Sequence, residues 1–164
     1  MYGDDVGEIA DEINEVDDVQ FQVQSQLMIG EECSKNDDPK GALAAFNKAI
    51  SLDPSCDMAW FNRGVLLEAQ QDARGARQAF QICLDVNPNH APATANLCIL
   101  LERIGDESGA YKMSTRALDF YPGHPAIMEV RERCSGSKTT KAMEEMTQVV
   151  TTDSFKEEDM SAAM

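Results

Sequence analysis

The chain has 164 residues, of which 43% are hydrophobic and 26% are charged, which is enough for one packed domain but not for two large ones. Acidic residues outnumber basic residues 29 to 14, which gives a formal net charge of −15. This balance argues against nucleic-acid binding and against docking on an anionic membrane, because both depend on Lys and Arg. No apolar run reaches the roughly 18 residues of a membrane-spanning helix, so we expect no membrane insertion.

The N-terminal segment is acidic and carries an apolar repeat. Residues 1–22 contain eight acidic residues and no Lys or Arg, hence a charge of −8. Its apolar residues recur at i, i+3, i+7 and i+10, which predicts an amphipathic helix: Val6, Ile9, Ile13 and Val16. Two interpretations remain open, a capping helix and an acidic interaction arm. The segment lacks the basic start and apolar core of a secretory signal, so we expect a cytoplasmic protein.

The cysteines also favour a cytoplasmic protein. There are five, an odd number, and none forms a C-x-x-C pair. Zinc clusters and thioredoxin-type redox motifs are therefore not indicated. In the absence of an export signal, we expect reduced thiols in a reducing compartment.

A repeat of 34 residues organises the middle of the chain. Residues 57–90 and 91–124 share 12 identities in 34 positions without a gap. The positions that recur in all three units include an Asp, a Gly, an Ala and a Pro: Asp38, Asp72 and Asp106; Gly41, Gly75 and Gly109; Ala42, Ala76 and Ala110; Pro54, Pro88 and Pro122. A fixed period of this length is typical of a helical-repeat protein.

Each unit has the pattern of two helices. In the second unit Trp60, Gly64 and Leu67 lie at i, i+4 and i+7, on one face of a first helix. Asp72 stands where the second helix should begin, because its carboxylate can accept a hydrogen bond from a free backbone N–H. Pro88 follows the second helix and ends it.

The pattern Trp60-x-x-Arg63-Gly64-x-x-Leu67, then Ala76-x-x-x-Phe80, then Pro88, resembles the tetratricopeptide repeat. The resemblance covers repeats at 23–56, 57–90 and 91–124. It implies an all-α fold, a right-handed superhelical α-solenoid of three helix-turn-helix repeats with flanking capping helices. The chain departs from the pattern at four positions, where the usual large residues are replaced: Gln26, Arg63, Thr94 and Ser114.

The predicted organisation has four parts. Residues 1–22 form the acidic arm or amphipathic capping helix, and residues 23–124 form the three repeats. Residues 125–135 are expected to form a C-terminal capping helix that begins at Pro125. Residues 136–164 contain a linker, a short amphipathic helix at 138–150 and an acidic tail.

Catalytic and cofactor motifs are not indicated. The sequence has no glycine-rich phosphate loop, no nucleophile elbow and no EF-hand spacing. Three cysteines, Cys33, Cys83 and Cys98, fall at packing positions of the repeat, which favours unreactive buried thiols over nucleophiles. We therefore expect no enzymatic activity, no cofactor and no metal site.

The resemblance implies that the first helices of the repeats line a concave groove that binds a peptide or a partner helix. The residues expected to line it are Leu27, Met28, Glu31, Met58, Phe61, Asn62, Val65, Asn96, Ile99 and Arg103. Asn62 and Asn96 occupy the same repeat position, and a side-chain amide can both donate to and accept from a peptide group. Most of the other positions are apolar, and exposed apolar patches usually mark a binding surface.

Members of the family that bind chaperone tails clamp a terminal carboxylate with Lys, Arg and Asn. The matching positions here hold Leu27, Glu31 and Pro92, with only Asn62 and Asn96 in agreement. We therefore expect an apolar helix or extended peptide as the ligand of a non-enzymatic adaptor or assembly/co-chaperone-like factor. The alternatives are an autoinhibited module, whose groove holds the segment at 138–150 or 6–16, and a regulatory subunit of an enzyme complex.

Overall fold

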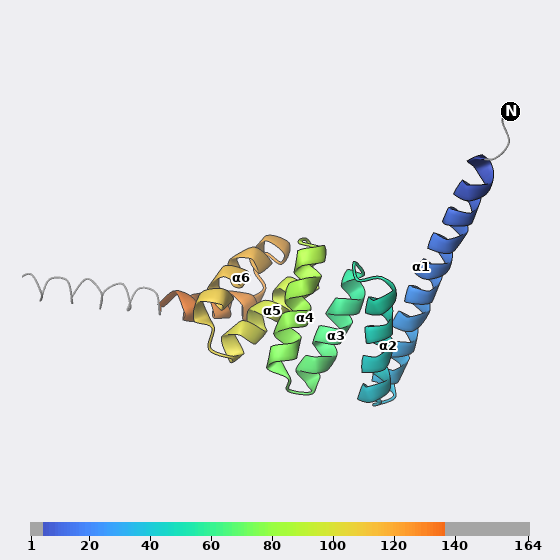
Figure 1. The fold of residues 1–164 in the computed structure, drawn as a ribbon. Coiled ribbons are helices and arrows are strands. Elements are labelled where there is room, and N and C mark those ends of the chain that lie inside the picture. The colour runs from blue at the N-terminus through green and yellow to red at the C-terminus, as the bar shows by residue number, and fades with distance from the viewer. Residues whose placement is uncertain (1–4, 137–164) are drawn as a thin grey trace, which may run out of the picture. The chain divides into compact units, whose positions relative to one another are not determined.

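The computed structural model describes residues 5–136, with side chains from residue 18 onward, and all its regular structure is helical (Figure 1). The labelled helices are α1 (Asp5–Lys35), α2 (Pro39–Leu52), α3 (Asp57–Ala69), α4 (Ala73–Val86), α5 (Ala91–Arg103) and α6 (Glu107–Phe120). A further helix covers residues 125–136. The all-α fold class is thus confirmed. The segment at 138–150 and the acidic tail lie outside the described residues.

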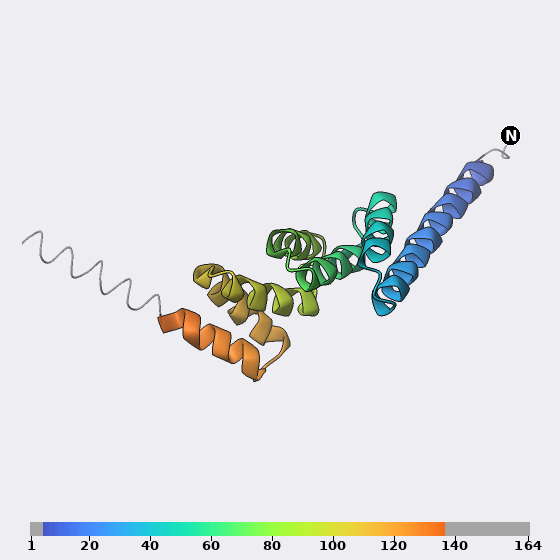
Figure 2. The ribbon, with the colours of Figure 1, turned by 90° about the horizontal axis from the view of Figure 1, so that it is seen from below.

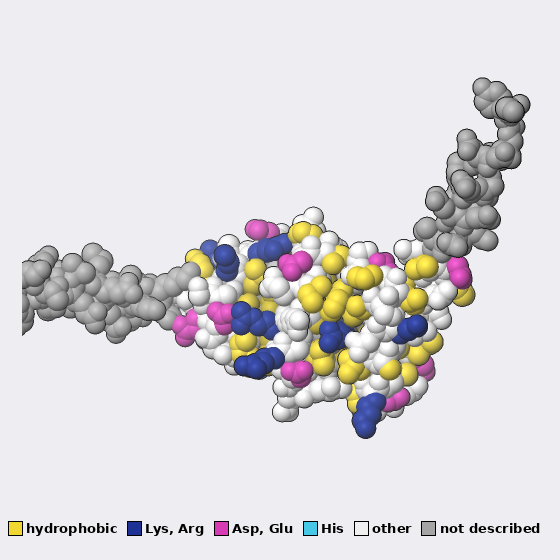
Figure 3. Space-filling model, in the orientation of Figure 1, with side chains coloured by type: hydrophobic (Ala, Val, Ile, Leu, Met, Phe, Trp, Pro, Cys, Tyr) yellow, Lys and Arg dark blue, Asp and Glu magenta, His cyan; other side chains and the backbone are white. Residues whose placement is uncertain are grey.

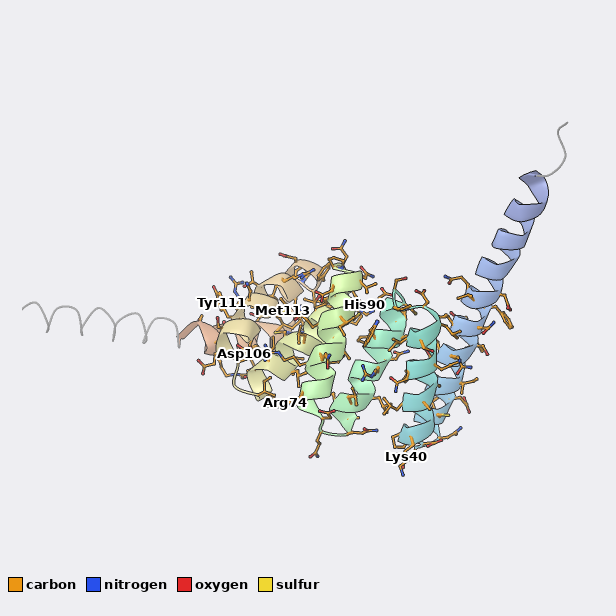
Figure 4. The ribbon with its side chains drawn as sticks, in the orientation of Figure 1. Lys40, Arg74, His90, Asp106, Tyr111 and Met113 are labelled. Carbon is orange, nitrogen blue, oxygen red and sulfur yellow. The ribbon has the colours of Figure 1, made fainter. Side chains whose placement is uncertain are left out.

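The helices keep the 34-residue period of the sequence. The first helices end at Lys35, Ala69 and Arg103, and the second helices begin at Pro39, Ala73 and Glu107. Each second helix starts after an N-cap aspartate whose carboxylate accepts a hydrogen bond of 2.9 Å from a glycine N–H three residues later. These caps are Asp38, Asp72 and Asp106, the last of which is labelled in Figure 4. The predicted helix starts are therefore confirmed, each with one free N–H satisfied.

The chain divides within α5 into two compact units, Met1–Leu97 and Cys98–Met164. In the first unit α1 packs on α2, α2 on α3 and α3 on α4. Its core contains Val23, Leu27 and Phe46 on one side and the fully buried Phe80 on the other. These apolar side chains supply most of the folding free energy through their removal from water.

Close approach of the paired helices depends on two glycines. A Cβ atom built on Gly30 would collide with the ring of Phe46, and one built on Gly64 would lie 2.6 Å from the ring of Phe80. The glycine on each first helix thus makes room for the phenylalanine on the second helix of the same repeat. This pairing explains why the two residue types recur together at a spacing of sixteen positions.

The second unit replaces this pair with a different combination of residues. Cys98 stands at the repeat position of Gly64, and Ser114 stands at that of Phe80. Both are fully buried, and the Cys98 thiol lies 3.8 Å from the carbonyl oxygen of Ala110. A larger residue on the first helix is therefore matched by a smaller one on the second, so the space between the helices stays filled.

The helix at 125–136 packs in the second unit. Ile127 and Val130 are buried along it, and its Arg133 forms an ion pair of 2.7 Å with Glu102. The helix begins at Pro125, as the sequence predicts. Its role as a cap stays a prediction.

Helix α1 is the longest helix, with 31 residues, and it does not break between residues 22 and 23. The N-terminal segment and the first helix of the first repeat are therefore one continuous helix, although the sequence analysis divided them. Both ribbon views show α1 continuing past the end of α2 (Figures 1 and 2).

The cysteines differ in exposure. Cys83 and Cys98 are fully buried, as expected from their packing positions, whereas Cys33 is half-buried. The expectation of a buried Cys33 is therefore wrong, because this residue stands near the end of α1, where less of the chain packs over it. Burial raises the pKa of the Cys83 thiol to about 12 and that of the Cys98 thiol to about 11.

These thiols predict a loss of stability at alkaline pH. The pKa of Cys83 in the folded chain, about 12, lies above the ordinary value of 9.0, so the unfolded chain releases the proton first. The stabilisation is complete below pH 9 and decreases as the pH rises from 9 toward 12. Between pH 7 and pH 11, the free energy of unfolding measured in urea should fall less steeply for Cys83→Ala than for the natural chain. Parallel declines would contradict a buried, neutral Cys83.

Candidate binding groove

A cleft of about 620 Å³ opens between α1, α2 and α3 in the first unit. Phe46 and Leu66 supply apolar surface, and Asn62 and Val65 of α3 lie beside them. Glu31 and Lys35, near the end of α1, border the same cleft. The cleft thus combines an apolar interior with a few polar groups, as is usual for ligand-binding sites.

Asn62, which lines this cleft, has a side-chain donor without a partner. Its Nδ2 atom is buried and has no hydrogen-bond partner, although the residue as a whole is only half-buried. A buried amide without an acceptor costs about 1–3 kcal/mol. A ligand that brings a carbonyl oxygen to Nδ2 would remove this penalty.

The polar border of the cleft carries both signs of charge. Glu31, Lys35 and Asp37 are all exposed, so this border has one basic and two acidic side chains. Asp37 adopts the left-handed backbone conformation, with φ of 57°, in the turn between α1 and α2. Asparagine and aspartate tolerate this conformation better than most residues.

Three of the predicted groove residues meet at the cleft: Glu31, Asn62 and Val65. Met28 and Met58 are exposed, with 63% and 43% of their surface accessible, and they provide apolar surface outside its lining. Figure 3 shows exposed apolar side chains among polar ones over α2, α3 and α4.

Leu27 was expected in the groove, and this expectation is wrong. Its side chain is only 7% exposed and belongs to the core with Val23 and Phe46. The reason is helical register: Leu27 lies four residues after Val23 and three before Gly30, on the face of α1 that packs on α2.

Phe61 is held in a cluster of rings. Its ring centroid lies 4.8 Å from that of His90 and 6.1 Å from that of Phe80. His90, which Figure 4 labels, is buried, and its Nδ1 accepts a hydrogen bond from the N–H of Ala93. Phe61 is consequently half-buried and fixed by its neighbours.

The remaining predicted residues are divided between the units. Asn96 is half-buried in the first unit, while Ile99 and Arg103 are exposed in the second. A joint role of these three residues in one groove stays a prediction.

The sequence analysis missed several residues of the cleft. Phe46 and Pro39 belong to α2, and Asp37 belongs to the turn before it, whereas the predicted groove contains residues of first helices only. Phe21 is another exposed residue that it missed: it lies seven positions before Met28, on the same side of α1, and is 74% exposed. The available signal was an aromatic residue two positions before the first repeat.

Within residues 5–136 no group of three His, Cys, Asp or Glu side chains is placed to hold a metal ion. None of the described helices is long and apolar enough to cross a membrane.

Residues 23–56 match the family model of the tetratricopeptide repeat. No curated protein sequence matches the chain. Among solved structures, the TPR domain of Arabidopsis OM64 is 15% identical, with a TM-score of 0.62, 68% of this chain covered and 93% of that chain. MamA is 18% identical, with a TM-score of 0.65 and coverages of 79% and 81%.

A third similar structure has a bound ligand. The second TPR domain of human RPAP3, in complex with the HSP70 peptide SGPTIEEVD, is 15% identical, with a TM-score of 0.65 and coverages of 71% and 98%. At these identities the structural likeness establishes the fold. The 34-residue register of α1 to α6 agrees with this fold, that of tetratricopeptide-repeat domains, and the sequence match to the family covers residues 23–56.

Proposed function

We propose that the chain is a protein–protein interaction module whose first unit binds an extended peptide or an apolar helix in the cleft between α1, α2 and α3. The observation that carries the proposal is Asn62, which lines this cleft and whose buried Nδ2 atom has no acceptor. A carbonyl oxygen of the ligand would accept from it, while an apolar side chain would cover Phe46 and Leu66. No catalytic step is required of the chain, which would act as an adaptor or assembly factor.

The same type of ligand is supported by the surface beside the cleft. Val65, which lines the cleft, is 40% exposed. Met28 on α1 and Met58 on α3 add exposed apolar surface on the same two helices. Methionine suits binding surfaces because its unbranched side chain adjusts to different partners. Similar folds bind peptides, as in the RPAP3 domain with its HSP70 peptide.

The experiment selects peptides from a random phage-displayed library on the full chain and measures their dissociation constants by fluorescence anisotropy. We expect peptides with a large apolar residue. Their affinity should fall about tenfold in Val65→Glu, which buries a charge against the apolar ligand, and about two- to tenfold in Asn62→Ala, which removes one hydrogen bond.

Val86→Glu is the matched control. Val86 is 38% exposed on α4 and does not line the cleft, so the same substitution should leave the affinity unchanged. Equal losses in Val65→Glu and Val86→Glu, or a library that yields no binders, would refute the proposal.

Acidic chaperone tails are predicted not to bind. Residues 23–124 contain thirteen acidic and nine basic residues, and Glu31 stands at the cleft where a carboxylate clamp would need a base. Calorimetry with the peptide SGPTIEEVD, the ligand of the RPAP3 domain, should give no binding heat at physiological salt. Micromolar binding would show that other residues supply the missing clamp.

A further inference from the structure

Helix α1 is much longer than the helices that pack against it. It has 31 residues, whereas α2 has 14 and α3 has 13. At an equal rise per residue, α2 can accompany less than half of α1. Among the described side chains, those that α1 contributes to the core run from Val19 to Cys33. Both ribbon views show the N-terminal part of α1 continuing past the end of α2 (Figures 1 and 2).

The apolar repeat of the sequence continues along this extension. In the core, Val23, Leu27 and Gly30 follow one another at steps of four and three residues. Towards the N-terminus the same alternation of steps gives four apolar positions, which we call the N-terminal stripe: Val6, Ile9, Ile13 and Val16. Alternating steps of three and four residues are the register by which one helix packs along another.

The charge of the extension determines the kind of partner. Residues 1–22 carry a charge of −8, with no basic residue to offset it. If two copies of the chain paired through this extension, two segments with a charge of −8 each would face one another, and their repulsion disfavours self-association. The chain's own segment at 138–150 has two basic and two acidic residues, hence no net charge to complement the extension.

The positions of individual acids support this argument. Asp5 and Glu12 directly precede two stripe residues, Val6 and Ile13. Asp17 directly follows another stripe residue, Val16. These are the positions from which charges pair across two packed helices. Their partners in a matching helix would be Lys or Arg.

We propose that residues 5–18 of α1 form a second docking surface, separate from the cleft, which binds a basic amphipathic helix of another protein. The partner helix would place an apolar stripe along the N-terminal stripe and Lys or Arg beside Asp5, Glu12 and Asp17. At about 1.5 Å per residue the surface is about 20 Å long, or two heptads. The chain would then hold two different segments at once, one at the cleft and one on the α1 extension.

The test uses a fluorescent peptide of three heptads with Leu at the first and fourth positions and Lys at the fifth and seventh. Anisotropy titration of the full chain should show binding that weakens at least tenfold in the double variant Ile9→Asp, Ile13→Asp. This variant makes the chain more acidic, so non-specific attraction of the Lys-rich peptide would become stronger instead of weaker.

Two further variants complete the test. Ile29→Asp is the matched control, because Ile29 is 45% exposed on α1 but lies outside the stripe, and it should bind as the natural chain does. The charge reversal Glu12→Lys, Asp17→Lys should lose the Lys peptide and gain a peptide with Glu at the same positions. Asn62→Ala should leave Lys-peptide binding unchanged, which separates this surface from the cleft.

Several outcomes would overturn the proposal. These are the absence of binding, binding that the stripe variant retains, or a loss of equal size in Ile29→Asp. Sedimentation equilibrium that shows a dimer broken by the stripe variant would assign the surface to a second copy. An affinity that rises when residues 137–164 are deleted would assign it to the chain's own C-terminal segment.

Discussion

Replacement of Phe80 by alanine should lower the free energy of unfolding by about 3–5 kcal/mol, the cost of removing a buried phenylalanine and leaving a cavity. The ring is fully buried, packs against Gly64 and lies 6.1 Å from the ring of Phe61. Because the backbone of both helices is fixed by their neighbours, little collapse can refill the space. Urea denaturation followed by circular dichroism gives the change directly.

Phe21→Ala is the control for this substitution. The same atoms are removed from a residue that is 74% exposed, so the free energy of unfolding should change by less than about 0.5 kcal/mol. Similar losses in the two variants would mean that the repeat register assigned to α3 and α4 is wrong.

The sequence could predict the helices because each signal is local. Aspartates at 34-residue intervals give N-caps, and the residues that follow them form helices of identical length in all three repeats. The fold class therefore followed from the period alone. The continuity of α1 across residue 22 could not be predicted in this way, since a change of charge along a helix does not interrupt its backbone hydrogen bonds.

The cleft was only partly predictable. Glu31, Asn62 and Val65 follow from the positions that line first helices, whereas Leu27 fails because three degrees of freedom, the tilt, rotation and offset of α2 on α1, decide which side chains are covered. Asp37 lines the cleft from a turn in which it is itself the left-handed residue, and Pro39 follows at the start of α2. The same conformation recurs at Gln71 and Gly105, 34 and 68 positions later, yet only glycine signals it by residue type.

The unsatisfied amide of Asn62 was beyond sequence reasoning altogether. Asparagine at this position predicts a polar contact, but the burial of Nδ2 without an acceptor depends on the packing around it in three dimensions. That feature connects the packing of the first unit to its proposed function. The helix arrangement that buries Phe46 and Phe80 also leaves the Nδ2 atom of Asn62 without an acceptor.

Replacement of Gly64 by alanine should destabilise the chain by about 1–3 kcal/mol, the usual cost of overpacking. A Cβ atom at this position would lie 2.6 Å from the Phe80 ring, closer than side-chain atoms tolerate, and the ring has no free space to move into because it is fully buried. This cost should exceed the gain of up to about 1 kcal/mol that alanine brings over glycine in a helix. Urea denaturation of the single variant checks the sign and size.

The effect should reverse when the ring is absent. In a Phe80→Ala background the clash disappears, so Gly64→Ala should retain only its helix propensity and stabilise the chain by up to about 1 kcal/mol. The two substitutions would thus be strongly coupled in a double-mutant cycle. The third repeat already contains such an exchange: Cys98 replaces the glycine, Ser114 replaces the phenylalanine, and both remain fully buried. Additive effects at Gly64 and Phe80 would show that the two residues do not share one space, and that the third repeat needs a different explanation.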